Sequence, residues 1–269
     1  RAATAAVLFL ALVLATRREA LLSLLGSRAA RRTLMLFGVG LYLSQITYAI
    51  SIEMTNAGTA TVLQATCTVF VMLFTCLRAR RLPRPTDFAG LVAALAAAAL
   101  IATQGDWGVI VLPAAGLAWS IANALSETLY IMAPQRLYGR WDRVTIIGVG
   151  MVVSGVAAAI VWLAAAAASL SPAPGAASLV PELDAVGWLA LIGGVGVLGT
   201  FAAFGLFLYG VSLVGSVRGS LLGVAEPVGA MVIAAVWLGT PFSAADWGGL
   251  VLMAAMIALV SLSGSREKR

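Results

Sequence analysis

The residue best suited to chemistry in this sequence is Glu127, which lies well inside a predicted membrane-spanning helix over residues 109–133. An ionisable side chain at the centre of such a helix costs on the order of 3 kcal/mol on insertion, whereas a Leu there contributes only about −0.5 kcal/mol. Intramembrane ionisable residues generally face a polar cavity and are functional by default. We predict that Glu127 lines a pathway for a substrate or a proton.

Three further polar residues lie on the same side of that predicted helix. Ser120, Asn123, Glu127 and Tyr130 fall at positions i, i+3, i+7 and i+10, which form one stripe along a helix. The stripe is typical of a lined pathway, and the alternative is a structural patch that hydrogen-bonds another helix. Trp119, beside the stripe, either lines the same cavity or packs against a neighbour.

A second carboxylate, Glu226, precedes Pro227 in a predicted span over residues 217–238. Proline has no N–H group and leaves an upstream carbonyl unpaired, so the helix bends or opens there. Freed carbonyl groups beside a carboxylate can contact a cationic group or a proton, which makes Glu226 a candidate substrate contact. The alternative is a kink that only shapes helix packing.

Three polar residues of the first half complete the candidate substrate-binding set, namely Gln45, Tyr48 and Gln64. Gln45 and Tyr48 share one helix face, and all three lie within or near predicted spans. They are either cavity contacts or interhelical hydrogen bonds, which contribute roughly 1 kcal/mol or less each.

The residue types argue against an enzyme and against metal or cofactor chemistry. The chain has no histidine, which excludes a Ser-His-Asp triad, His-ligated metals and His proton relays. Cys67 and Cys76 lie nine residues apart on opposite faces of one predicted helix, so we expect small hydrophobic residues and no disulfide. Glycines lacking a following Gly-Lys-Ser/Thr form no phosphate loop; we predict packing and hinge surfaces from Gly193, Gly194, Gly196, Gly199, Gly205 and Gly210. We expect no catalytic residue, no metal and no cofactor.

The elements that must position these residues are long apolar helices. The 269 residues are 61% hydrophobic and 10% charged, whereas soluble domains carry about 25% charged residues. Apolar runs near 20 residues recur along the chain, which predicts an all-α, polytopic membrane protein, a bundle of transmembrane helices. We place nine spans near residues 2–16, 33–52, 55–77, 87–104, 109–133, 144–168, 185–211, 217–238 and 246–263.

The basic residues orient these spans, because Lys and Arg stay on the cytoplasmic side during insertion. When the nine spans are threaded back and forth, all Lys and Arg residues except Arg1 fall on one side, at 17–32, 78–84, 136–143, 218 and 266–269. The other connections contain no Lys or Arg, and their charged residues are acidic: Glu53, Asp106, Glu182, Asp184 and Asp246. The C-terminus is therefore predicted to be cytoplasmic. The net charge of +6 reflects this bias, at positions that face an anionic leaflet. We expect no nucleic-acid partner.

Three further expectations follow from this topology. Arg1 lies outside, so we expect one more helix before it in the intact parent, which makes ten. The segment 169–184 is rich in Pro, Ala and Ser and is predicted to be an external loop. The segment 17–32 is either a short interfacial helix on the cytoplasmic surface or a plain basic loop.

The sequence contains a weak internal repeat. Tyr48-Ala-Ile-Ser-Ile and Tyr209-Gly-Val-Ser-Leu begin similar stretches, Gly58 then matches Gly219, and Asp87-Phe-Ala-Gly90 matches Asp246-Trp-Gly-Gly249 after a two-residue slip. One copy starts a helix at the outer face and the other at the inner face. This pattern indicates an inverted-topology repeat, which is typical of secondary transporters.

Two motifs carry a resemblance to a known family. Residues 56–64 read NAGTATVLQ and residues 219–227 read GSLLGVAEP, with Ala118-Trp119 between them. The chain resembles the drug/metabolite transporter superfamily, its EamA-type branch in particular, over essentially its whole length. The resemblance implies ten helices, two inverted five-helix repeats, cytoplasmic termini and a central cavity. The repeats would be 1–104, with helices 2–5, and 105–269, with helices 6–10. The family often has Pro where Thr66 stands and Leu-Gly-Glu where Leu77-Arg78 and Leu238-Gly239-Thr240 stand.

We therefore predict a secondary transporter in the inner or plasma membrane that moves small amphipathic metabolites or drugs, in the direction of export, by alternating access. Proton coupling is a hypothesis that rests on Glu127 and Glu226. The alternatives are a membrane scaffold or assembly subunit without a transported ligand, and a nucleotide-sugar carrier of the same superfamily. A nucleotide-sugar carrier needs basic residues in its cavity, whereas the deep charges here are acidic, which favours cationic or zwitterionic cargo. The sequence leaves the coupling ion and the oligomeric state open, a homo-oligomer included.

Overall fold

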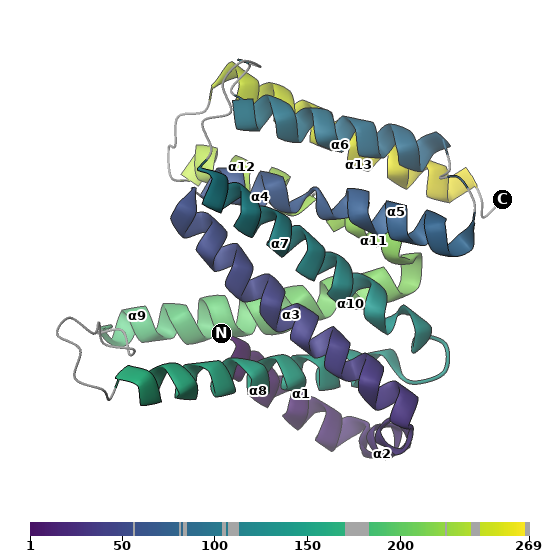
Figure 1. Cartoon of the computed structure of the whole chain (residues 1–269), viewed down its shortest axis with the longest axis vertical. Helices are drawn as coiled ribbons and strands as arrows, with labels where there is room; N and C mark the ends of the chain where they lie inside the picture. The colour runs from purple at the N-terminus through teal and green to yellow at the C-terminus, as the bar shows by residue number, and fades with distance from the viewer. Residues whose placement is uncertain are drawn as a thin grey trace. The chain divides into compact units, whose positions relative to one another are not determined.

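A computed structural model of the chain describes residues 1–55, 57–80, 82, 85–103, 106, 113–169, 183–223, 225–237 and 243–266. These residues contain no β-strand; an isolated bridge joins Tyr138 and Trp141. The helical elements (Figure 1) are α1 (Ala2–Thr16), α2 (Arg18–Gly26), α3 (Arg28–Met54), α4 (Ala57–Gln64), α5 (Cys67–Ala79), α6 (Pro85–Thr103), α7 (Ala114–Met132), η1 (Ala133–Arg136), α8 (Arg143–Ser169), α9 (Ala185–Leu189), η2 (Ala190–Ala202), α10 (Ala203–Val214), α11 (Ser216–Gly223), α12 (Ala225–Trp237) and α13 (Ala244–Arg266).

Each predicted span overlaps one or more of these helices, as expected because a long apolar run in lipid satisfies its backbone polar groups only as a helix. Three helical segments of the described chain are long and apolar enough to cross a membrane: Arg28–Met54, Arg143–Ala167 and Ala185–Val214. Only 17% of the apolar window in the third segment is buried inside the chain, so its outward side chains suit contact with lipid. The number of crossings and the two inverted repeats stay predictions.

The structure describes one predicted connection, the segment 17–32, and only a small part of another, the segment 169–184. The segment 17–32 contains the helix α2 and the first residues of α3, which agrees with a helix there rather than a plain loop. The predicted outer loop lies largely outside the described residues, as do Glu182, Arg81, Arg84, Lys268 and Arg269. Cys67 is a buried free thiol, and Cys76 is a partly buried one.

The chain forms two compact units, and each draws on both predicted repeats. One unit comprises Arg1–Tyr42 and Ala133–Gly210, and the other comprises Leu43–Met132 and Val211–Arg269. The division falls within α3 and within α10, so each of these helices contributes to both units.

In the first unit, α1 packs along α8 and also contacts η2 (Figure 1). Residues four apart on α1, namely Ala5, Phe9 and Val13, form its buried face. Small residues let these helices approach closely: a Cβ atom on Gly148 would lie 2.6 Å from Val13 Cγ2, and one on Gly205 would lie 2.9 Å from Phe9 Cζ.

The predicted glycine-rich helix has an unusual backbone and only part of its glycines pack. Residues Ala190–Ala202 form a π-helix, where the Thr200 hydroxyl donates to the Val195 carbonyl at 2.7 Å. π-helices are rare and occur mostly as single turns inside α-helices, so this 13-residue segment is unusual in length. Gly196 lies buried against Thr4, which agrees with the predicted packing role, whereas no described atom lies within 4 Å of a Cβ position on Gly194.

Close contact between α3 and α8 gives a first testable prediction. A Cβ atom on Gly38 would lie 2.8 Å from the Gly150 carbonyl oxygen and would overlap Val153. We expect Gly38→Leu to reduce the free energy of unfolding by about 2 kcal/mol, because overpacking of this size forces backbone shifts. Thermal unfolding in detergent measures the change. Gly194→Leu is the matched control, and equal unfolding temperatures for the two variants would contradict the packing described here.

In the second unit, α6 and α13 lie side by side, and α11 contacts both (Figure 1). Their shared core is made of Ala65, Met72, Leu91, Ala94, Ala97, Leu221, Met253 and Met256. The helices α4 and α5 both contact α7, and α11 contacts α5 and α7. This arrangement surrounds the polar stripe of α7 with helices of both halves of the sequence.

Candidate functional site

The polar stripe of α7 is buried along its whole length. The exposed fractions are 2% for Ser120, 1% for Asn123, 7% for Glu127 and 2% for Tyr130. The four residues thus share one inward face, as their spacing predicts. Leu117, Ile121 and Leu125 are exposed large apolar side chains of the same helix, so α7 is polar inside and apolar outside. Such an arrangement suits a helix that lies in a membrane with its polar face toward protein.

The stripe has two parts with different partners. At one end, the Ser120 hydroxyl lies 2.7 Å from the Ser51 hydroxyl of α3. The amide nitrogen of Asn123 donates to the backbone carbonyl of Ser44, also in α3, at 2.8 Å. These two residues make the interhelical hydrogen bonds that the structural alternative predicts.

Glu127 and Tyr130 form the other end of the stripe. The Tyr130 hydroxyl donates to Oε1 of Glu127 at 2.9 Å. Gln64 at the end of α4 and Cys67 at the start of α5 lie beside the same carboxyl group and interact with it electrostatically. The carboxyl group therefore sits where α4 ends, α5 begins and α7 passes.

The junction of α4 and α5 is a true interruption of the helix. Ala65 and Thr66 separate the two elements, and the Thr66 hydroxyl donates to the carbonyl of Leu63 at 2.6 Å. The Thr68 hydroxyl donates to the carbonyl of Ala65 at 2.9 Å. The backbone N–H groups of Thr66 and Thr68 donate to the same Leu63 and Ala65 carbonyls at 3.0 and 3.2 Å, so the hydroxyl groups add second hydrogen bonds to a turn with i+3 to i pairing. The Thr128 hydroxyl of α7 donates to the Ala124 carbonyl of its own helix at 2.8 Å and lies 3.4 Å from the Cys67 carbonyl. Interrupted helices that point at a polar group are typical of transporter binding sites.

Several buried acceptor atoms near Glu127 have no donor within the described part of the chain. They are Oε1 of Gln64, Oδ1 of Asn123 and Oε2 of Glu127. A buried polar atom without a partner costs about 1–3 kcal/mol, so each one needs an explanation. All three accept hydrogen bonds, and the group that would satisfy them is a donor such as an ammonium group or a proton on the carboxylate.

The other predicted site residues lie in different surroundings. Glu226 lies in the first turn of α12 and is exposed, and its charge acts on Glu127. The Tyr48 hydroxyl lies 2.7 Å from the Thr61 hydroxyl, which links α3 to α4. Gln45 is half-buried on α3. Trp119 is 38% exposed and lies on the outer side of α7, away from the buried stripe.

Sequence reasoning missed several residues around the stripe. Ser44, Thr47 and Ser51 of α3 are buried, and their i, i+3, i+7 spacing is a stripe of the same kind as that on α7. That spacing was the available signal. Cys67 was assigned only a packing role, although its thiol lies beside the Glu127 carboxyl group. Within the described residues, no three Cys, Asp or Glu side chains gather to hold a metal ion.

Comparison with known proteins shows what the chain is similar to. The model of the EamA-like transporter family matches residues 1–103 and 114–262. The uncharacterized inner membrane transporter YicL of Salmonella typhimurium is 28% identical over 268 residues, which are 98% of this chain and 85% of that protein. A protein of known crystal structure has a TM-score of 0.73 at 17% identity, over 100% of this chain and 87% of its own, and shows a shared fold.

Proposed function

Because this chain belongs to the EamA-like transporter family and is a membrane transporter, we propose that it carries small organic cations or zwitterions that bind at Glu127. The observation that supports this proposal is the group of unpartnered acceptor oxygens on Gln64, Asn123 and Glu127. A protonated amine supplies several N–H donors and a positive charge, which together match a carboxylate and neighbouring amide oxygens.

The proposed transport cycle uses the same site from both sides of the membrane. The interrupted α4–α5 helix and α7 belong to one compact unit, so they present the carboxyl group as a single assembly. Alternating access would expose this assembly first to one side of the membrane and then to the other, as in other secondary transporters. We propose an inner-membrane location, export and a cytoplasmic C-terminus, in line with the basic clusters of the sequence.

Proton coupling is part of the proposal. A carboxyl group that binds a cation in one step can bind a proton in the other, so substrate and proton would compete for Glu127. Glu226 lies near enough for its charge to influence that exchange. The prediction is that release of substrate on one side accompanies proton uptake on the same side.

Transport into proteoliposomes tests the substrate class. We expect accumulation of a primary amine when a pH gradient is imposed, and none of a uridine-diphosphate sugar. Vesicles without protein provide the baseline for each compound, and an internal pH dye reports the proton flux. Transport of the uridine-diphosphate sugar alone would favour the nucleotide-sugar carrier, the alternative within the superfamily.

The two natural cysteines separate a transporter from a membrane scaffold. Cys67 is buried beside Glu127, and Cys76 lies nine residues further along α5 and is partly exposed. In single-cysteine variants made with Cys76→Ser or Cys67→Ser, a transporter predicts modification of Cys67 by a water-soluble thiol reagent that is slowed by substrate. The rate at Cys76 should not respond to substrate. A scaffold predicts no substrate effect at either cysteine.

A further inference from the structure

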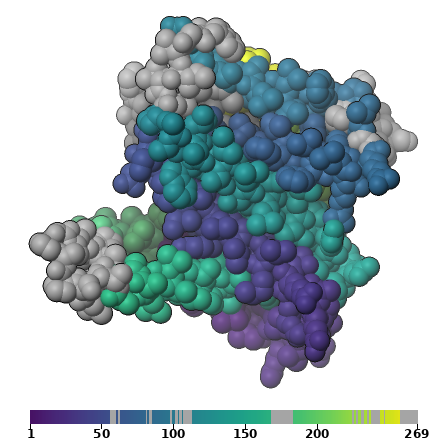
Figure 2. All heavy atoms as spheres, in the orientation of Figure 1, coloured from purple at the N-terminus to yellow at the C-terminus, as the bar shows by residue number. Residues whose placement is uncertain are grey.

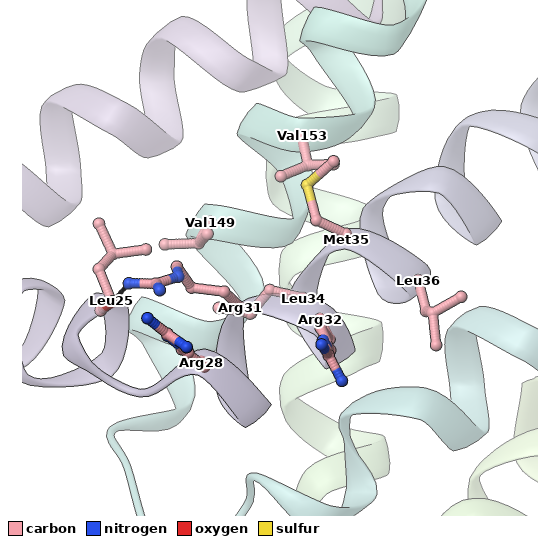
Figure 3. A pocket seen from close by; sticks show the side chains of 9 residues that line it. All are labelled: Leu25, Arg28, Arg31, Arg32, Leu34, Met35, Leu36, Val149 and Val153. Atoms are coloured by element: carbon pink, nitrogen blue, oxygen red, sulfur yellow. Dashed lines mark hydrogen bonds between the residues drawn. The ribbon is translucent and has the colours of Figure 1, made fainter.

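A pocket of about 870 Å³ opens on the first compact unit, at the junction of α2 and α3 and beside α8. In the space-filling view, α2 and the start of α3 lie at the surface of this face (Figure 2). The lining residues are Leu25, Arg28, Arg31, Arg32, Leu34, Met35, Leu36, Val149 and Val153 (Figure 3). The lining combines three arginines with apolar side chains and contains no acidic residue, so it is both cationic and apolar.

The three arginines lie within the first five residues of α3. Ser27 caps this helix, because its hydroxyl accepts a hydrogen bond from the Ala30 N–H group at 3.3 Å. Positions 28, 31 and 32 are spaced i, i+3 and i+4, and like charges at these spacings repel one another on a helix surface. They also lie at the helix N-terminus, where the macrodipole disfavours positive charge. A bound anion would offset both effects.

The guanidinium groups are available to such an anion. The Arg31 Nη1 donates to the Leu25 carbonyl at 2.7 Å, which joins the end of α2 to the pocket and fixes this side chain. Arg28, Arg31 and Arg32 are exposed. Among the described residues none of the three forms an ion pair. Guanidinium forks of this kind match the oxygens of a phosphate group.

The apolar part of the lining continues from the arginines along the helices. Met35 and Leu36 follow Arg31 and Arg32 by four residues on α3, which is about 6 Å along a helix, and they are 55% and 56% exposed. Val149 and Val153 form a matching pair on α8. Figure 3 shows Arg28 and Arg31 next to each other beside Leu25, Arg32 apart from them past Leu34, and Met35 and Val153 above. Both helices include segments apolar enough to span a membrane.

We propose that this pocket binds an anionic phospholipid of the surrounding bilayer. The phosphate of the headgroup would contact Arg28, Arg31 and Arg32, and an acyl chain would run along Met35, Val149 and Val153. The arginines start a membrane-spanning segment, which is the depth at which headgroups lie. Charge complementarity together with this adjoining apolar surface selects a lipid over a free phosphate ion, which has no use for the apolar half.

Native mass spectrometry of the purified protein with added lipid tests this proposal. We expect phosphatidylglycerol to bind more tightly than phosphatidylcholine of the same acyl chains. The double variant Arg28→Gln/Arg32→Gln should bind phosphatidylglycerol about 30-fold more weakly, which is about 2 kcal/mol, or roughly one per basic residue. Arg31 is left in place because it holds α2. Arg136→Gln/Arg140→Gln removes the same charge from an exposed segment and should keep affinity within about twofold.

Two further arms identify the ligand. Met35→Gln/Val153→Thr keeps all three arginines and should also weaken phosphatidylglycerol binding, since it places polar groups beside the acyl chain. Inorganic phosphate should not displace the lipid. The proposal is wrong if the two lipids bind equally well, or if the two double arginine variants lose the same affinity. It is also wrong if inorganic phosphate displaces the lipid, because the site would then be one for a free anion.

Discussion

Glu127→Gln should abolish cation transport while the protein stays folded. The substitution keeps the size of the side chain and leaves an oxygen that can still accept the Tyr130 hydroxyl, now 2.9 Å from Oε1. It removes the charge that would attract a cation and the group that would carry a proton. Loss of one partner of a buried charge pair costs about 2–5 kcal/mol, so we expect at least roughly 30-fold weaker substrate binding. Substrate-driven proton flux, measured with the internal pH dye, should disappear as well.

The control for this prediction is Glu53→Gln. Glu53 is an exposed glutamate near the end of α3, and its substitution removes the same charge away from the stripe. Transport should remain within about twofold of the unchanged protein, since surface substitutions of this kind have small effects. If both variants transport equally, or if transport by the variant with Gln at both 127 and 226 stays pH-sensitive, the carboxylates do not carry the proposed mechanism.

The sequence predicted the helices and the buried face of α7 well, for a physical reason. An apolar run of about 20 residues has only one low-energy structure in lipid, and the polar positions of a helix fix which side turns inward. Glu127 could therefore be identified as a candidate before its surroundings were known. Its position where α4 meets α5 could not, because the residues of that junction are far from it in sequence.

The helix interruption at Ala65–Thr66 shows what sequence patterns do not reveal. Neither glycine nor proline marks this point. Here the hydroxyl groups of Thr66 and Thr68 add hydrogen bonds to the carbonyls of Leu63 and Ala65, which also accept from the backbone N–H groups of the same threonines. Threonine is common in ordinary helices and strands, so its presence in the sequence does not mark this turn.

Only part of the arginine pocket could be predicted from the sequence. The cluster at positions 28, 31 and 32 was visible as a basic segment, and its role in membrane orientation followed from composition. Val149 and Val153 lie more than a hundred residues away and contribute the apolar wall only after folding. The same arginines can thus set topology during insertion and hold a lipid afterwards.

The division of the α7 stripe leads to the second large prediction, on the stability of the fold. Ser120→Leu should lower the free energy of unfolding by about 3 kcal/mol, because the position is 2% exposed and extra methylenes in a packed core force backbone shifts. The neighbouring contact is also tight, since a Cβ atom on Gly116 would lie 2.5 Å from Thr55 Cγ2 of α3. The unfolding temperature in detergent should fall by roughly 10 °C. Ser126→Leu, a half-buried serine of the same helix, should change it little.

Ser120→Ala then decides what the hydroxyl group of Ser120 does. If it only joins α7 to Ser51 of α3 at 2.7 Å, its loss costs about 1 kcal/mol of stability and leaves the apparent substrate affinity unchanged. If it contacts substrate, affinity falls about tenfold with little change in unfolding temperature, since a lost hydrogen bond then appears in binding instead of folding. We expect the first result at Ser120 and the loss of affinity only at Glu127, because Oε2 of Glu127 has no donor among the described residues, whereas Ser120 already has its partner.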